Sequence, residues 1–379
     1  MKTDHIRMSL PTKAVAAHRR PVFRPSQSAF AAELRGAARA WLDARHDHQY
    51  ANVTTMLKVA AMAGVAVLFY LAALSATRGY AYIGLYAGFA VTAVLLAANS
   101  LHDASHGAFF RSRGLNAAMM RVTAVALGIE PAYWQVRHVR YHHPNANIEH
   151  IDLDTAANRF LRQTPFQPWF PQFRFQHLYW PVIAGLSMPY IGLVYDWSDR
   201  FGLTPLARDR VLRGFGGWLR FIASKLAHFF LCLALPLWLV APSVGYGAVI
   251  GGYVLGQLLA SCLLVTLILG THWADTQFYD ISDGAPLPHT REEHAFLTCC
   301  DWEASPRIMG GLLGGLNLHL THHLFPHFHH RHYPALAKIV GQVAARHGLP
   351  YRCLSYRELL RAQQHFLESM GQKPVTSHV

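Results

Sequence analysis

The chain has 379 residues, of which 52% are hydrophobic and only 15% are charged, and its net charge is +13 with histidine neutral. Soluble domains usually carry about 25% charged residues, so this composition excludes an ordinary soluble domain and favours a membrane protein. The basic balance alone could indicate nucleic acid binding. No nucleic-acid-binding motif accompanies it, however, and the basic residues flank apolar runs, which favours contact with an anionic membrane surface.

The first element in chain order is a basic, mostly polar segment, residues 1–54, which has no signal-peptide pattern and is expected in the cytoplasm. A membrane domain, residues 55–355, and a C-terminal cytoplasmic tail, residues 356–379, are expected to follow. A helix needs ~20 largely apolar residues to cross a bilayer, and four runs in the membrane domain meet that length. The predicted spans lie at about 57–77, 79–101, 224–241 and 246–271.

The four predicted spans pair as two tight hairpins. The second pair is separated by APSVGYG (241–247), whose proline and two glycines indicate a turn. Weaker apolar stretches at about 117–130 and 178–195 are interpreted as interfacial or re-entrant helices. The alternative is that they form a fifth and a sixth span.

The distribution of Lys and Arg predicts the orientation in the membrane. The segment before the first span and the loop 102–225 are rich in arginine, whereas the two hairpin turns hold only Arg78 between them. Both termini and the central loop are therefore expected in the cytoplasm, and a bacterial inner membrane is the expected location.

Histidine clusters follow these spans and the central loop, all on the expected cytoplasmic side. They read HDASH (102–106), HVRYHH (138–143) and HLTHH (319–323), with a single histidine in GTHWADTQ after the fourth span. The candidate metal ligands are His102, His106, His138, His142, His143, His272, His319, His322 and His323.

The spacing of these histidines predicts a metal centre. Residues four or three apart share one face of an α-helix, so His102 and His106 are expected to face one metal. His138 and His142 are expected to do the same, with His143 turned by ~100° toward a second metal. The three histidines of HLTHH are expected on one face. Imidazole suits Fe, Zn, Cu and Ni, and nine ligands suit two irons with an open position.

Other metal chemistries fit the sequence less well. The chain has no HExxH motif of a zinc protease and no Glu-x-x-His motif of a soluble di-iron bundle. A haem protein would place histidines within its spans. A non-enzymatic membrane metal-binding or transport protein would place polar ligands near the middle of the membrane, whereas these histidines lie at the span ends.

From about residue 80 to 355 the chain resembles the membrane fatty acid desaturase family, whose three histidine boxes match the clusters quoted above. Its linoleoyl-CoA and front-end branch is similar in HHPNANIEHIDLD (142–154) and GGLNLHLTHHLFPHFHHRHYPAL (314–336). GTHWADTQF (270–278) resembles the segment that supplies an extra histidine ligand. Front-end members often carry glutamine where His319 stands.

The resemblance implies an all-α integral membrane protein with four transmembrane helices and a cytoplasmic helical cap that holds two iron ions. It implies an O2-dependent desaturase that removes hydrogen from two adjacent carbons of a fatty acyl chain and consumes two external electrons. The substrate would be linked to CoA, acyl carrier protein or phospholipid. Because the cytochrome b5 haem motif HPGG is absent, a separate ferredoxin or cytochrome b5 with a reductase would supply the electrons. A lipid hydroxylase, acetylenase or carotenoid oxygenase on the same scaffold is the alternative.

Several further residues have two interpretations. Asn317 either supports a water near the metal or caps a turn, and Asp152 and Asp154 either hold histidine N–H groups or form a solvated turn. The histidines from His327 to His332 are expected to form a solvated or headgroup-facing surface rather than metal ligands.

Overall fold

The computed structural model describes residues 21–25 and 29–374, and these residues are mostly helical, with α denoting α-helices and η denoting 3-10 or π-helical turns. The helices are α1 (Ala29–Asp43), α2 (Val53–Leu74), α3 (Gly79–Asn99), α4 (Leu101–Ser105), α5 (Arg113–Leu127), α6 (Pro131–Val136), η1 (Arg137–His142), η2 (Leu153–Thr155), η3 (Pro171–Phe175), α7 (Gln176–Tyr190), η4 (Ile191–Tyr195), α8 (Asp196–Arg200), η5 (Pro205–Asp209), α9 (Gly214–Phe229), η6 (Phe230–Ala234), α10 (Leu235–Leu239), α11 (Ala241–Val244), α12 (Tyr246–Ile268), η7 (Leu269–His272), α13 (Arg291–Thr298), α14 (Arg307–Leu312), α15 (His319–Leu324), η8 (His330–His332), α16 (Tyr333–Arg346) and α17 (Tyr356–Gly371). Two short strands, β1 (Asp301–Glu303) and β2 (Cys353–Ser355), pair in parallel with Asp301 opposite Cys353.

The fold is that of an all-α membrane protein. Five helical stretches are long and apolar enough to cross a bilayer, and they comprise the four predicted spans and one more, Pro171–Arg200. Large apolar side chains on α2, including Leu57 and Leu68, are about two-thirds exposed. A helix in water would cover such a face with polar residues, so this face of α2 suits contact with lipid.

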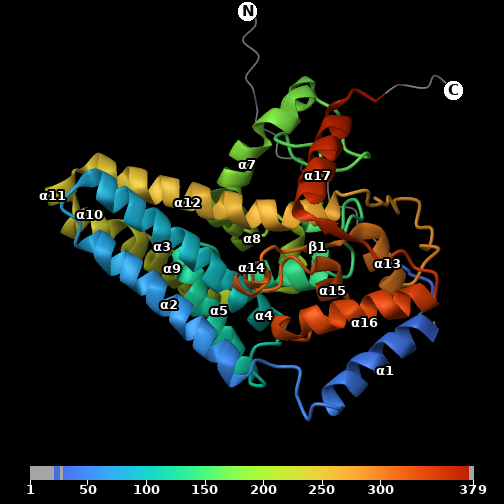
Figure 1. Cartoon of the computed structure of the whole chain (residues 1–379). Coiled ribbons are helices and arrows are strands. Elements are labelled where there is room, and N and C mark those ends of the chain that lie inside the picture. Colours follow the sequence, from blue (N-terminus) through green and yellow to red (C-terminus); the bar gives the residue numbers. More distant parts are fainter. Residues whose placement is uncertain (1–20, 26–28, 375–379) are drawn as a thin grey trace, which may run out of the picture.

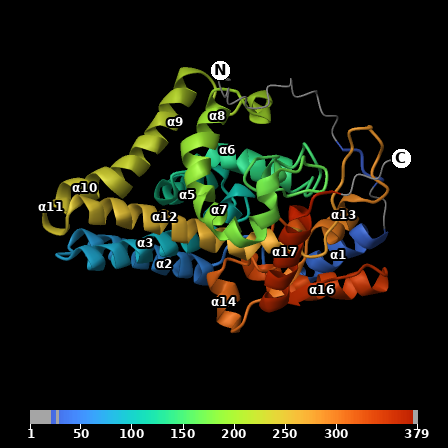
Figure 2. The same cartoon turned by 90° about the horizontal axis from the view of Figure 1, so that it is seen from above.

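Helices α2, α3 and α12 lie side by side as one arm of the molecule, and α9 and α10 diverge from α12 with α11 at the corner (Figures 1 and 2). Close approach of α12 to α3 depends on two buried glycines. A Cβ atom on Gly252 would lie 2.7 Å from the Tyr82 ring, and one on Gly256 would lie 3.0 Å from the Cβ of Ala90. Small residues allow membrane helices to approach closely enough for dispersion contacts to stabilise them.

Helices outside the candidate spans form a helical cap at the other end of this arm. Helix α1 packs on α16, and both contribute to a core with α13 and α15 that includes Phe30, Leu320 and Leu336. Residues 356–371, predicted as part of a tail, form helix α17 and pack against α7 and η3 (Figure 1). In the predicted segment 1–54, residues 1–20 and 26–28 lie outside the described part, as do residues 375–379 of the predicted tail.

Buried ion pairs tie the segment with the second histidine cluster to α8 and α9. Arg137, at the start of η1, pairs with Asp199 in α8, and both side chains are almost fully buried. The Lys225 ammonium of α9 donates to the Asp196 carboxylate at 2.6 Å and to the carbonyl oxygens of Gly128 and Gly192 at 2.8 and 2.9 Å. A buried charge persists only when it is paired and hydrogen-bonded, so these contacts fix α8 and α9 against η1.

We expect Gly256→Leu to destabilise the protein by about 1–3 kcal/mol, the usual cost of forcing extra methylene groups into a packed interface. The matched control is Gly251→Leu, because a Cβ atom at Gly251 meets nothing within 4 Å. Thermal unfolding of the two purified variants in detergent measures the difference. Equal unfolding temperatures would show that the α3–α12 contact does not depend on a small residue at position 256.

Candidate metal centre

All nine predicted histidines converge on one place in the cap, at the end of the membrane helices. Within each of two groups of four, one nitrogen of every ring lies within 4.8 Å of the others. The first cluster comprises His102, His106, His138 and His322, and the second cluster comprises His142, His272, His319 and His323. The rings are buried, except that His323 is half-buried.

The ninth histidine, His143, lies between the two clusters. Its Nε2 is 3.1 Å from Nε2 of His138 and 2.9 Å from Nε2 of His322, both in the first cluster. Its ring stacks on that of His323 in the second cluster, with the centroids 4.2 Å apart. His143 is therefore placed to serve either cluster.

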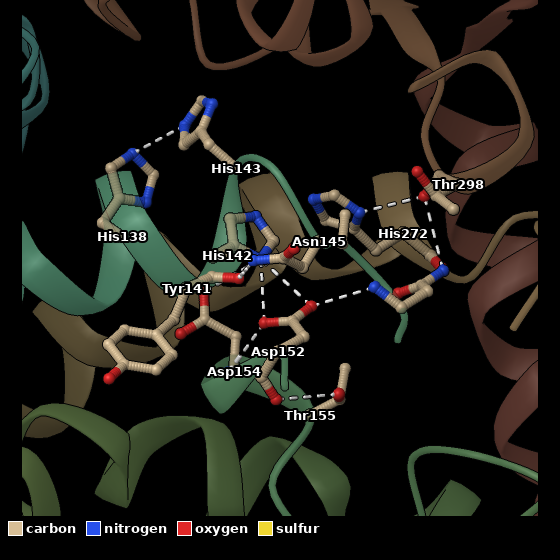
Figure 3. A network of polar contacts seen from close by, with 12 residues as sticks. His138, Tyr141, His142, His143, Asn145, Asp152, Asp154, Thr155, His272 and Thr298 are labelled. Carbon is tan, nitrogen blue, oxygen red and sulfur yellow. Dashed lines mark hydrogen bonds and ion pairs between the residues drawn. The ribbon is translucent and has the colours of Figure 1, made fainter. Parts of the chain in front are cut away.

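The three histidines of HVRYHH divide between the two clusters differently from the prediction. His138 and His142 were expected to face one metal, but they lie in different clusters, and His138 and His143 point toward each other instead (Figure 3). The reason is local. Residues 137–142 form a π-helical turn, closed by a hydrogen bond from the His143 amide to the His138 carbonyl. The hydrogen bonds of a π-helix join residues five apart rather than four, so its turn is wider than that of an α-helix and a spacing of four no longer places two side chains as an α-helix would.

The third box also divides between the clusters, although its three histidines were expected on one face. Helix α15 has six residues, and successive residues on an α-helix are rotated by ~100°. His319 and His323, four apart, face the second cluster, whereas His322 faces the first. Helix α15 therefore lies between the clusters and supplies both. His102 and His106, also four apart, face the first cluster together as predicted.

Three histidines are oriented by a partner at the nitrogen that faces away from the clusters. The Nδ1 atom of His142 lies 3.2 Å from both oxygens of Asp152, which also accepts from the amides of Asn147 and Asp154 at 3.0 Å (Figure 3). The tautomer that donates from Nδ1 leaves Nε2 free to bind a metal. Asp154 lies 3.5 Å from the same Nδ1 with its side chain half exposed.

The other two oriented histidines use partners that the sequence reasoning missed. His272 Nδ1 lies 3.0 Å from the carbonyl oxygen of Thr298, and its Nε2 lies 2.8 Å from Nε2 of His319. His322 Nδ1 lies 2.7 Å from the hydroxyl of Tyr333, which is fully buried. A backbone carbonyl leaves no mark in a sequence. Tyr333 follows the third box by ten residues, and no spacing rule connects it with His322.

Burial sets the charge of most of these rings. It lowers the pKa of His106, His138, His143, His319, His322 and His323 well below the usual value. These rings are therefore neutral, which is the form that binds metals. Burial also disfavours the charged form of His142, but the carboxylates of Asp152 and Asp154 outweigh it and raise the pKa of His142 to about 9. A cation at this position would replace that proton.

The clusters fit metal ions on two observations. Nitrogen atoms bound to one ion at ~2.1 Å lie roughly 3 Å apart, and the facing Nε2 atoms of His102 and His138 are 3.2 Å apart. Both ring nitrogens of His106 and Nε2 of His323 are buried without a hydrogen-bond partner in the described chain. Buried polar atoms are rarely left unpaired, so these nitrogens need a ligand of another kind.

The histidine run after the third box was predicted to form a solvated surface. The structure shows instead that most of it is buried. His329, His330 and His332 are at most 5% exposed, and only His327 is exposed. Asn317 is also buried. Its amide donates to the carbonyl oxygen of Trp302 at 3.0 Å, and its own carbonyl oxygen has no partner among the described residues.

Comparison with known proteins agrees with this site. The family model for fatty acid desaturases matches residues 80–355. The acyl-lipid (7-3)-desaturase of Chlamydomonas reinhardtii is 30% identical over 298 residues, 72% of this chain and 54% of the relative. The sn-1 linoleoyl-lipid 6-desaturase of Arthrospira platensis is 28% identical over 304 residues, 77% of this chain and 78% of the relative.

The acyl-lipid (7-3)-desaturase of Rebecca salina is 32% identical over 278 residues, 68% of this chain and 57% of the relative. The chain thus spans little more than half the length of two of these relatives and over three-quarters of the third. It belongs to the fatty acid desaturase family.

We expect Asp152→Asn to weaken metal binding about 10–100-fold, the usual cost of losing the partner of a histidine ligand. The neutral amide keeps the shape of the carboxylate but accepts less strongly from His142 Nδ1. Asp154→Asn is the matched control, because its side chain is half exposed and lies farther from the same nitrogen. Titration of both iron-free variants with Fe2+ measures the effect, and equal affinities would contradict the orienting role of Asp152.

Proposed function

We propose that this protein is a di-iron desaturase that introduces a C=C bond into a lipid-linked acyl chain. The observation that carries the proposal is the convergence of eight imidazoles into two adjacent four-nitrogen clusters, with the ninth, His143, between them, in a chain of the fatty acid desaturase family. The proposed iron ligands are His102, His106, His138, His142, His143, His272, His319, His322 and His323.

Bound iron would activate O2, which is the oxidant of the reaction. One O2, two electrons and two protons would be consumed with two C–H bonds, and one C=C bond and two waters would form. The electrons would come from a separate carrier protein. Imidazole alone also suits Zn, Cu and Ni, and the choice of iron rests on the family.

The choice of a lipid-linked substrate, rather than one linked to CoA or acyl carrier protein, rests on the relatives. Those reported above are named acyl-lipid or linoleoyl-lipid desaturases. The location of the clusters at the ends of apolar helices supports the same choice, because an acyl chain held in the bilayer can reach them from the membrane side.

The residues of this chain have three tasks in the proposed reaction. The nine imidazoles bind the metals, and Asp152, the Thr298 carbonyl and Tyr333 hold the rings of His142, His272 and His322 in the binding tautomer. The surrounding burial excludes water from the centre, which strengthens each electrostatic contact.

We also infer four spans, with the metal centre on the cytoplasmic side. His143 and His272 lie on the same side because both reach one site, so the chain between them crosses the membrane an even number of times. Three of the apolar stretches, Pro171–Arg200, Gly214–Leu239 and Tyr246–His272, lie in this interval. The first has two prolines inside α7 and two buried aspartates in α8, so it is the stretch that does not cross.

Wild-type protein loaded with iron should hold about two irons per chain, one for each cluster. A host that expresses it should accumulate an unsaturated lipid whose double bond mass spectrometry can locate. His272→Ala and His323→Ala should both lose iron and product, because each removes a ligand from the second cluster. His365→Ala is the control, since His365 is exposed on α17 and belongs to neither cluster. One tightly bound zinc and no iron-dependent product would overturn the proposal.

The topology can be tested with single cysteines in a background in which the exposed Cys353 is replaced by serine. Thr77→Cys should be labelled by an impermeant reagent from outside, because position 77 lies in the first hairpin turn. Leu203→Cys and Ser282→Cys should both be labelled only from the cytoplasm. Labelling of position 203 from outside would show that Pro171–Arg200 crosses the membrane and that the four-span arrangement is wrong.

A further inference from the structure

A buried group of charged and polar side chains lies behind the first histidine box and is used by neither metal cluster. Asp103 stands between His102 and His106 in the box itself and is 1% exposed. His330, from the run after the third box, contacts Asp103, and Lys58, from α2, contacts His330. Segments that are far apart in the sequence therefore meet at the back of this box.

The hydrogen bonds of this group run in one direction. The Lys58 ammonium has donors only, so Nε2 of His330, 2.9 Å away, accepts from it. The His330 proton is then on Nδ1, which donates to Oδ2 of Asp103 at 2.5 Å. Lys58 also donates to the carbonyl oxygen of Gly311 at 3.0 Å. One positive charge, one neutral ring and one negative charge thus form a neutral chain from α2 to the first box.

A second imidazole faces the same carboxylate. Nδ1 of His329 accepts from the Arg331 amide at 3.1 Å, which leaves the His329 proton on Nε2. That nitrogen lies 3.2 Å from Oδ2 of Asp103 without the alignment of a hydrogen bond. Asp103 is therefore approached from one side by two rings of the run that was predicted to be solvated.

The metal ligands of the first box have no outer partner of their own. Nδ1 of His102 and both nitrogens of His106 meet no hydrogen-bond partner in the described chain, unlike Nδ1 of His142, His272 and His322. Their helix, α4, has only five residues. It is separated from α3 by the irregular backbone of Ser100 and ends before Gly107, which has a positive φ of 68°. The orientation of these two rings therefore depends on how α4 itself is held.

We propose that Lys58, His330 and Asp103 form a positioning chain that holds α4, so that His102 and His106 face the first metal. All three are positioning residues, because none belongs to either cluster of converging nitrogens. The inference rests on the proposed di-iron function. It adds that the first metal depends on a charged residue of the first membrane helix.

A third metal ion held by Asp103, His329 and His330 is the competing explanation, since their ligand atoms also lie within 4.8 Å of one another. The contact with Lys58 disfavours it. The ammonium already donates to His330 and balances the charge of Asp103, and a further cation would be repelled by it.

The test uses the full chain loaded with 57Fe and read by iron content and Mössbauer spectra. Lys58→Met and His330→Leu should weaken the first iron site about 10–100-fold. Iron content should therefore fall from about two toward about one per chain, as the signal of one of the two sites disappears. His330→Gln should restore both irons, because its amide can accept from Lys58 and donate to Asp103. Lys338→Met is the matched control, at an exposed lysine of α16.

The unfolding temperature of each iron-free variant separates positioning from general stability. Loss of one iron from Lys58→Met, at an unfolding temperature equal to that of Lys338→Met, supports the positioning chain. Should His330→Leu fail to fold, Lys58→Met still decides, because Lys58 is the partly exposed member of the positioning chain. Two irons with unchanged spectra in Lys58→Met would overturn the positioning chain but not the di-iron function. Three ions in the wild type would favour the third metal site instead. A wild type without iron would overturn both the positioning chain and the proposed function.

Discussion

The convergence of nine imidazoles, all buried except the partly buried His143 and His323, is the constraint on which the rest of the structure depends. Each ring is costly to bury unless its nitrogens bind something, and the nine rings come from four segments spread between residues 102 and 323. Their meeting requires the ends of α4, η1 and η7 and the short helix α15 to lie within a few ångströms of one another. The membrane helices, the cap and the connecting loops are arranged so that this meeting is possible.

Buried charge pairs hold the first two histidine boxes against neighbouring helices. Arg137 with Asp199 and Lys225 with Asp196 hold the second box against α8 and α9, and Asp103 with His330 and Lys58 holds the first box against α2. Near a bilayer such pairs have little competition from water, so each one specifies a single arrangement. The histidine clusters are thus tied to the apolar helices by electrostatics as well as by apolar packing.

The histidine site also bears on the proposed topology. Apolar length alone admits five spans, and the proposed four follow because a site shared by His143 and His272 requires an even number of crossings between them. Irregular helical turns occur where the backbone departs from regular α-helical geometry. The π-helical turn at η1 is one example, and it distributes a single histidine box between two clusters.

The sequence by itself determined the membrane class, the approximate positions of the four long apolar helices and the nine histidines, because apolar length and metal-ligand spacing are local properties. It did not determine which histidine joins which cluster, since that depends on a π-helical turn at residues 137–142 that no spacing rule predicts. Nor did it show that His329 and His330 are buried against Asp103. A polar residue looks solvated in a sequence when its partner is more than 200 positions away, and only the tertiary structure brings the two together.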